Sequence, residues 1–244
     1  MIVTIDGPAG AGKSSAARTL AKRLGYRFLD TGAMYRAVTW AAVQRTHDWN
    51  DTQGLADLAA SLDILLRADR VLVDGVDVTR EIRTMEITAL VYHAANNPAV
   101  REVLVTLQQN VANGQDIVTE GRDQGTIVFP EAQCKIFLTA TPEERARRRQ
   151  LDLQRRGEMV PFEKVLADQN ERDMRDVNRD AGPLVPAHDA IVFYTDGLTE
   201  EQVVGRLESI VRDRTPPYFL SRKKNIPATA ASGDSTPFSD RTDN

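Results

Sequence analysis

GPAGAGKS, residues 7–14, is the stretch that decides the fold of this chain, because it fits the phosphate-binding pattern G-x-x-x-x-G-K-[ST]. The apolar run at 2–6 predicts a buried strand before it, and 14–24 predicts the helix that follows it. A strand, a glycine-rich loop and a helix in this order turn backbone N–H groups and a helix N-terminus toward a polyphosphate. The sequence therefore predicts that the chain binds a nucleoside triphosphate.

The residue types within this phosphate-binding loop (P-loop) suit that role. Gly7, Gly10 and Gly12 can adopt positive φ, which lets the backbone curl around a phosphate group. Lys13 adds a positive charge, and the Ser14 hydroxyl is a candidate ligand for Mg²⁺.

Composition places the 244-residue chain among ordinary globular proteins, with 41% hydrophobic and 27% charged residues. A net charge of −4 argues against wholesale binding to nucleic acid. Cys134 is the single cysteine, so the chain can form no internal disulfide and no cysteine metal site. No apolar run approaches the roughly 18 residues of a membrane span, and the chain enters its first strand without a basic leader, so we expect a cytoplasmic protein without a membrane partner.

Alternating helix and strand signals predict an α/β fold with a doubly wound parallel sheet. Strands are expected at 27–30, 116–119, 135–138 and 190–194. Helices are expected at 33–44, 100–112, 142–156, 161–177 and 199–212. Thr141 is the expected cap of the helix that opens with Pro142, and Thr199-x-x-Gln202 resembles a capping box.

Residues 50–97 break this alternation and are interpreted as an inserted subdomain. Two strands at 62–66 and 71–74 flank a polar turn, the strand signal continues at 76–79, and 82–95 is expected to be helical. We therefore expect one domain, 1–214, with its core at 1–49 and 98–214. Residues 215–244 are rich in Ser, Thr, Pro and Asp, which predicts a disordered tail.

Three further segments suggest a second phosphate site: 30–36 (DTGAMYR), 120–126 (EGRDQGT) and 171–180 (ERDMRDVNRD). The first two follow predicted strands, at the sheet edge where doubly wound folds bind ligands. The third lies late on a predicted helix, where its arginines and Asp176 share one face. Such a face is usually solvated, but arginine forks suit phosphate oxygens, so the chain has the parts for two phosphate-bearing substrates.

Together with EIRT at 81–84, VFP after GRDQGT, and PLVPAHDA after NERDMRDVNR, these motifs resemble those of the bacterial cytidylate kinases, which are nucleoside monophosphate (NMP) kinases. The resemblance runs from the first strand to about Arg212. It implies a P-loop kinase core, an NMP-binding insert at about 50–97 and a mobile helical lid at about 145–165. The implied activity is Mg²⁺-dependent transfer of the ATP γ-phosphoryl group to CMP or dCMP.

The resemblance also implies roles for individual residues. The ATP phosphates would be held by Gly7, Pro8, Ala9, Gly10, Ala11, Gly12, Lys13, Ser14 and Ser15. Ser14 or Ser15 would bind Mg²⁺, with Glu120 acting through water. The acceptor nucleotide would be held by Thr31, Arg36, Arg101, Arg122, Asp123, Arg172, Asp176 and Arg179, of which Arg122 and Asp123 lie near the cytosine ring. The expected catalytic residues are Lys13, Arg122 and Arg179. A lid arginine among 145–149 could also reach the γ-phosphate, or that run could be a solvated helix face.

Three departures from the family pattern stand out. Tyr92 stands where the family often has Ser. Glu120 stands where some relatives have Asp. Ser14-Ser15 stands where some relatives have Gly-Thr and others have Ser-Thr.

Other functions remain open at this stage. Another P-loop kinase could act on UMP, dTMP, AMP or shikimate, although the late arginine cluster and the insert argue against shikimate. A GTPase-like switch would read guanine with Asn-Lys-x-Asp, which the sequence lacks. A nucleotide-gated nucleic-acid binder would need a basic face, and a net charge of −4 does not indicate one. We expect a monomer.

Overall fold

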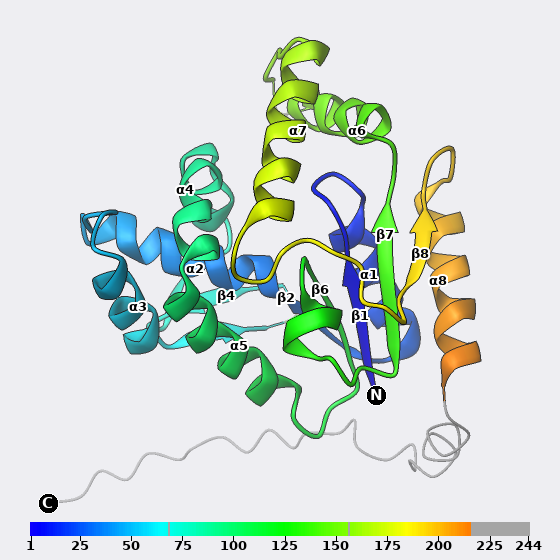
Figure 1. Cartoon of the computed structure of the whole chain (residues 1–244), viewed down its shortest axis with the longest axis horizontal. Coiled ribbons are helices and arrows are strands. Elements are labelled where there is room, and N and C mark those ends of the chain that lie inside the picture. The colour runs from blue at the N-terminus through cyan, green and yellow to red at the C-terminus, as the bar shows by residue number, and fades with distance from the viewer. Residues whose placement is uncertain (68, 156, 216–244) are drawn as a thin grey trace, which may run out of the picture. The chain divides into compact units, whose positions relative to one another are not determined.

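The computed structural model of this chain describes residues 1–67, 69–155 and 157–215. Residues Met1–Arg214 form one compact unit (Figure 1). The predicted tail, apart from Thr215, lies outside the described residues.

A five-stranded parallel sheet in the order β2-β6-β1-β7-β8 lies at the centre of this unit. Its strands are β1 (Ile2–Asp6), β2 (Arg27–Asp30), β6 (Ile117–Gly121), β7 (Cys134–Thr139) and β8 (Ile191–Tyr194). β1 is the middle strand, and its Val3 and Ile5 side chains have no exposed surface, as expected of a strand covered on both faces. Because every strand runs the same way, the P-loop and the segment after β6 meet at one edge of the sheet. The predicted doubly wound α/β fold is confirmed.

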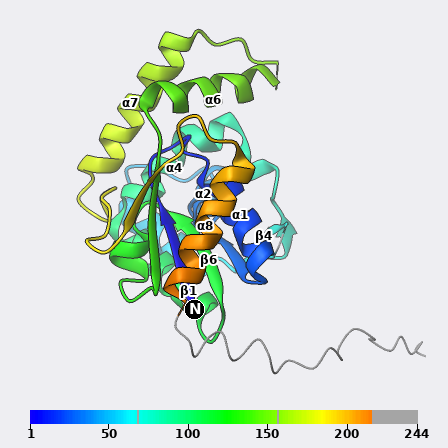
Figure 2. The same cartoon turned by 90° about the vertical axis from the view of Figure 1, so that its right-hand side faces the viewer.

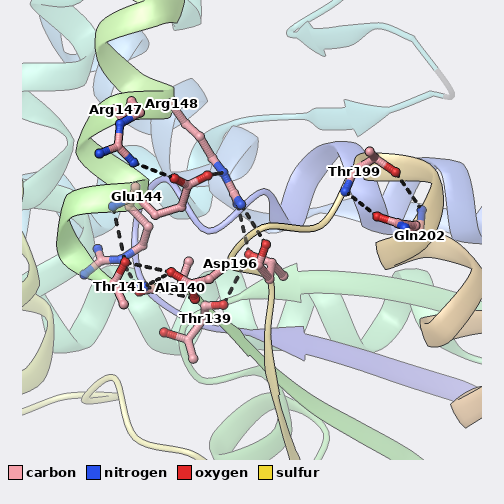
Figure 3. A network of polar contacts seen from close by, with 11 residues as sticks. Thr139, Ala140, Thr141, Glu144, Arg147, Arg148, Asp196, Thr199 and Gln202 are labelled. Atoms are coloured by element: carbon pink, nitrogen blue, oxygen red, sulfur yellow. Dashed lines mark hydrogen bonds and ion pairs between the residues drawn. The ribbon is translucent and has the colours of Figure 1, made fainter.

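Helices cover the two faces of the sheet. α1 (Lys13–Leu24) joins β1 to β2, and α2 (Thr31–Gln44) and α5 (Pro98–Ala112) lie in the chain between β2 and β6. Because crossovers between parallel strands are right-handed and these two run in opposite directions along the sheet, α1 is expected on one face and α2 and α5 on the other. α8 (Glu200–Arg214) packs against α1 (Figure 2). The predicted capping box of α8 is present, because Thr199 N–H donates to Gln202 Oε1 at 2.9 Å and Gln202 N–H donates to Thr199 Oγ1 at 3.3 Å (Figure 3).

Residues 50–97 add a small antiparallel sheet and two helices beside α2. The elements are α3 (Thr52–Ser61), β3 (Ile64–Leu66), β4 (Val71–Val73), β5 (Val76–Asp77), the 3₁₀ turn η1 (Glu81–Arg83) and α4 (Met85–Asn96). Leu55 of α3, Ile82 of η1 and Leu104 of α5 belong to one apolar cluster. The inserted segment therefore shares its core with the helices of the central domain.

The structure corrects two expectations for this segment. Helix α3 was not predicted, although Asp51 is its N-cap and accepts a hydrogen bond from Gly54 N–H at 2.8 Å. The helix expected over 82–95 is instead split at Thr84, which is extended (φ −66°, ψ 161°) and accepts a hydrogen bond from Ile87 N–H at 3.4 Å. Thr84 thus ends η1 and caps α4, because its hydroxyl competes with the helical backbone for hydrogen bonds.

Helices α6 (Pro142–Arg155) and α7 (Phe162–Asn178) form a hairpin above the carboxyl ends of β1 and β7 (Figure 1). Ala146 and Leu153 of α6 pack against Val165 of α7 in a small core of their own. Thr141 caps α6 as predicted, accepting a hydrogen bond from Glu144 N–H at 3.3 Å.

Candidate active site

The P-loop backbone can be built only with glycine at its first position. Gly7, Gly10 and Gly12 have φ of 146°, 77° and 86°, which confirms the predicted positive φ. A Cβ on Gly7 would lie 1.9 Å from the carbonyl oxygen of Leu138 in β7. A Cβ on Gly10 would lie 3.2 Å from Cβ of Arg145 in α6. The loop is therefore pressed between the sheet and the α6–α7 hairpin.

Lys13 is buried at the start of α1, and its Nζ donates to the carbonyl oxygen of Pro8 at 2.7 Å. Burial, followed by the nearby guanidinium of Arg122, lowers the pKa of Lys13 to about 7, while Glu120 opposes the shift. The ammonium group is thus short of negative partners, so a phosphate group placed here would restore its charge.

The two serines after Lys13 lie in different surroundings. Ser14 Oγ donates to Glu120 Oε1 at 2.7 Å, whereas Ser15 Oγ donates to the carbonyl oxygen of Gly12 at 3.1 Å; both residues are exposed. Burial, followed by the nearby Asp30 carboxylate, raises the pKa of Glu120. A hydroxyl beside a carboxylate supplies the oxygen ligands that Mg²⁺ prefers, so Ser14 with Glu120 fits the ion better than Ser15 does.

Among the described residues, no group of three or more His, Cys, Asp and Glu side chains could hold a metal ion. A cation at Ser14 would therefore take further oxygens from a bound phosphate or from water, as Mg²⁺ commonly does in phosphotransferases.

Three charged side chains from distant segments meet in a buried group, Arg101–Asp123–Arg179. Arg101 of α5 donates to Asp123 Oδ2, and Arg179 Nη2 lies 3.8 Å from Asp123 Oδ1. The three side chains are only 6%, 5% and 5% exposed. Burial raises the pKa of Asp123, and the two guanidinium groups oppose that rise. Arg179 Nε donates to the carbonyl oxygen of Gly182, yet its Nη2 is buried without a hydrogen-bond partner among the described residues.

A second pair lies between this group and the P-loop. Arg122 Nε donates to Asp176 Oδ2 of α7 at 2.8 Å. Burial alone would raise the pKa of Asp176, but the guanidinium groups of Arg122, Arg172 and Arg179 together outweigh it and the pKa falls. Burial, together with the neighbouring Arg122, lowers the pKa of Arg172 to about 10. Positive charge is therefore concentrated here beyond what nearby carboxylates neutralise, as suits a polyanionic ligand.

Thr31 and Arg36, both in α2, have protein partners in this structure. Thr31 Oγ1 donates to the carbonyl oxygen of Glu120 at 2.7 Å, which ties α2 to β6. Arg36 Nη1 donates to Thr88 Oγ1 of α4 at 2.8 Å, and burial lowers the pKa of Arg36.

Most of the candidate residues are thus brought to one edge of the sheet, but the predicted helix face is only partly right. Helix α7 ends at Asn178, so Arg179 lies beyond it. Arg175 is half-exposed, 3.9 Å from Glu171 and 5.9 Å from the ring of Tyr92, and so lies apart from the other arginines.

Arg83 and Asp6 at this edge were not among the sequence-based candidates, whereas Arg145 belonged to the arginine run considered for the lid. Arg83 of η1 donates to Asp30 Oδ2 at 3.0 Å, and the EIRT motif was the signal that could have identified it. Asp6 accepts hydrogen bonds from the loop after Arg122. Arg145 donates to the carbonyl oxygen of Ala9 at 3.1 Å and to Asp173. Nothing in the local sequence marks these last contacts, because their partners lie far away along the chain.

The arginine run of α6 has the ion pair expected of a solvated helix face, and Arg148 also makes contacts within the protein that were not predicted. Arg148 pairs with Glu144 at 3.0 Å, four residues earlier, as on a solvated helix face. Arg148 also donates to Oγ1 of Thr195 at 2.9 Å and to its carbonyl oxygen at 2.8 Å (Figure 3). Thr141 N–H and Oγ1 donate to Asp196 in the same network, so the base of α6 is tied to the segment that joins β8 to α8.

A P-loop and a second arginine-rich site at the carboxyl edge of one parallel sheet define a P-loop kinase. The family model described as "Cytidylate kinase" matches residues 3–213. The chain belongs to the cytidylate kinase family and is a phosphotransferase.

Individual relatives agree over almost their whole length. The chain is 51% identical over 213 residues to a cytidylate kinase from Rhodopirellula baltica, covering 87% of this chain and 93% of that protein. It is 50% identical over 207 residues to a cytidylate kinase from Pelotomaculum thermopropionicum, covering 83% and 92%. Among solved structures, a shikimate kinase from Bacteroides thetaiotaomicron is 13% identical with a TM-score of 0.46, covering 87% of this chain and 98% of that chain. This likeness is too distant to bear on the acceptor. None of the helices in the described part of the chain has the length and apolar character needed to cross a membrane.

Proposed function

We propose that the chain transfers the γ-phosphoryl group of Mg²⁺-bound ATP to CMP and dCMP, giving ADP with CDP or dCDP. The observation that carries the choice of acceptor is the buried Arg101–Asp123–Arg179 group. A carboxylate held between guanidinium groups at an otherwise closed site is costly to build unless a ligand uses its remaining hydrogen-bonding capacity. Arg179 Nη2, buried and without a hydrogen-bond partner in the described part of the chain, supplies such capacity.

Cytosine matches this group better than uracil does. The carboxylate of Asp123 accepts from the exocyclic amino group of cytosine, while a guanidinium donates to the ring nitrogen and carbonyl. Uracil presents a carbonyl oxygen in place of the amino group, so two acceptors would face each other. Losing one hydrogen bond to a charged group costs about 1.5–3 kcal/mol, which is about ten- to a hundredfold in selectivity.

The donor side consists of the P-loop from Gly7 to Ser15. Its backbone N–H groups and Lys13 would hold the phosphates, and Ser14 with Glu120 would hold Mg²⁺, which would offset the negative charge of the phosphates. The 2.7 Å hydrogen bond from Ser14 Oγ to Glu120 supports Ser14 as the ligand.

Positive side chains connect the two sites. Arg122 and Arg172 both help to lower the pKa of Lys13, and Arg122 helps to lower that of Arg172, which reflects their proximity. We assign the neutralisation of charge on the phosphoryl group in flight to Lys13, Arg122 and Arg179, and the positioning of the acceptor to Arg36, Arg101, Arg172 and Arg179. Thr31 and Asp176 complete the acceptor side, Asp176 at the sugar hydroxyls.

The α6–α7 hairpin acts in this proposal as the lid, and residues 50–97 as the acceptor-binding insert. Arg145 contacts the P-loop carbonyl of Ala9 directly, so a movement of α6 is felt at the donor site. Closure excludes water, which would otherwise accept the phosphoryl group.

Measurement of ADP production with Mg-ATP and, separately, CMP, dCMP, UMP, AMP, dTMP and shikimate tests the proposal. We expect kcat/KM for CMP and dCMP to exceed that for UMP by about ten- to a hundredfold. Equal turnover of UMP or AMP would contradict the role of Asp123 in base recognition. If none of the six acceptors is phosphorylated, the proposed acceptors are wrong and the enzyme uses a different one.

We propose that the enzyme works as a monomer, without nucleic acid, in the cytoplasm where both nucleotides are found. Sedimentation velocity tests the oligomeric state, and a dimer at enzymatic concentrations would contradict it.

A further inference from the structure

Asp6 is a buried carboxylate that the proposed mechanism does not use. It is the last residue of β1, directly before Gly7 of the P-loop, and is 4% exposed. Its Oδ1 accepts from Gln124 N–H at 2.8 Å, and its Oδ2 accepts from Gly125 N–H at 2.7 Å. No cation in the described part of the chain lies within ion-pair distance of it.

These two N–H groups open the single π-type turn η2 (Gln124–Val128). The first N–H groups of a helical turn have no partner within the turn, so Asp6 caps η2 from a neighbouring strand. Ile127 and Val128 N–H groups donate to the carbonyl oxygen of Asp123 at 2.9 and 3.2 Å. The backbone of Asp123 is thereby fixed by the same turn that Asp6 holds.

Gly125 allows this close approach. A Cβ on Gly125 would lie 2.9 Å from Thr4 Oγ1 and 3.3 Å from Asp6 Oδ2. Two consecutive N–H groups can therefore reach one carboxylate only because the second belongs to a glycine.

We propose that Asp6 is a positioning residue for phosphoryl transfer, which holds the acceptor loop of Arg122 and Asp123 at a fixed place relative to the P-loop. Gly7 follows Asp6 directly, and Asp123 precedes Gln124 directly, so one carboxylate joins the first residue of the donor loop to the acceptor loop. The inference rests on the acceptor role proposed above for Asp123. In-line transfer depends on this relative position, and errors of about 1 Å cost about a hundredfold in rate.

The cost of keeping a carboxylate here supports a functional reason for it. Burial raises the pKa of Asp6 to about 6, with the nearby Asp123 carboxylate adding to the rise, while the two N–H bonds and the charge of Lys13 oppose it. A residue that served only to fill the core would carry no such penalty.

Asp6→Asn is the first test, because the amide keeps the shape but offers one acceptor oxygen and points an NH₂ group at the other N–H. We expect KM for CMP to rise and the preference for CMP over UMP to fall, each by about tenfold. The Kd of an ATP analogue measured without acceptor should change less than about twofold, because the P-loop backbone is untouched. A residue with a merely structural role would not produce this difference between acceptor and donor binding.

Gly125→Ala disturbs the same contact from the other side and leaves Asp6 intact. If both variants act through one contact, the effects of the double variant on KM for CMP will fall well short of additive. Cys134→Ala is the matched control, since Cys134 is 1% exposed in β7 and pairs with Val3 of β1. It should lower the melting temperature without changing KM for CMP or the CMP preference.

The possible outcomes separate this inference from the proposed function. If Asp6→Asn and Gly125→Ala behave like Cys134→Ala, the inference is wrong and Asp6 is only a cap. Should Asp6→Asn fail to fold, Gly125→Ala decides by the same criteria. Asp123→Ala tests the acceptor site itself. If Asp123→Ala loses the preference for CMP but Asp6→Asn keeps it, the inference about Asp6 is wrong and the acceptor assignment stands. If Asp123→Ala keeps the preference, the acceptor assignment is wrong.

Discussion

Binding of Mg-ATP to this enzyme should take up a proton at Lys13. Burial, reinforced by Arg122, lowers the pKa of Lys13 from 10.5 to about 7 in the protein without nucleotide. This shift corresponds to a penalty of about 5 kcal/mol on the charged form. Phosphate oxygens placed beside Nζ favour the charged form, so the pKa rises on binding.

The size of the effect follows from the fraction of Lys13 that is neutral before binding. With a pKa near 7, about half of the molecules carry a neutral Lys13 at pH 7 and about nine-tenths do at pH 8. Binding at pH 8 should therefore take up about 0.9 proton, and the affinity for Mg-ATP should fall as pH rises above 7, by up to about tenfold per pH unit.

Isothermal titration calorimetry in two buffers with different ionisation enthalpies measures the uptake directly. Lys13→Met should abolish it, and Lys22→Met, which removes an exposed lysine of the same helix, should leave it unchanged. An uptake near zero at pH 8, with affinity independent of pH between about 7 and 9, would show that Lys13 is already charged in the free enzyme and refute the reasoning.

Three further predictions concern other parts of the molecule. Ser14→Ala should raise the Mg²⁺ concentration needed for half-maximal rate by about tenfold and Ser15→Ala by less than about twofold, in Mg²⁺ titrations at fixed ATP; the reverse order would assign the ion to Ser15. Gly182 has φ of 65°, and an added Cβ would lie 2.2 Å from Arg101 Nη2 and 2.3 Å from Asp123 Oδ2. Gly182→Ala should therefore raise KM for CMP and leave the Kd for ATP unchanged. An unaltered KM would argue against the acceptor role of the Arg101–Asp123–Arg179 group. Thr199→Ala removes the capping box of α8 and should lower the free energy of unfolding by about 0.5–2 kcal/mol in urea with kcat unchanged; an unchanged midpoint would mean that the cap contributes nothing.

Local signals predicted much of the fold. The P-loop could be found because glycines, lysine and serine act within one short segment, where positive φ is needed at fixed positions. The capping box of Thr199 and Gln202 was predictable for the same reason, since its two hydrogen bonds span three residues.

Local reasoning was less successful in the inserted segment. Helix α3 has a capping Asp51 but a glycine, Gly54, in its first turn, which lowers helix propensity. Its stability comes from burial of Leu55 and Leu58 against the shared core, and that burial depends on tertiary structure. The split at Thr84 was missed because an apolar pattern continues across it, while one capping hydroxyl decides where the helix begins.

The candidate site shows the same division. The sequence by itself determined that the chain binds polyphosphate and carries arginines for a second phosphate group, because these properties depend on residue type and on short spacings. Only the tertiary structure decided that Arg101, Asp123 and Arg179 meet while Arg175 does not, and that Asp6 holds the turn after Asp123. Ion pairs and hydrogen bonds form over about 3–4 Å, whereas these residues are separated by tens of positions along the chain, so their pairing exists only after the sheet and helices have packed.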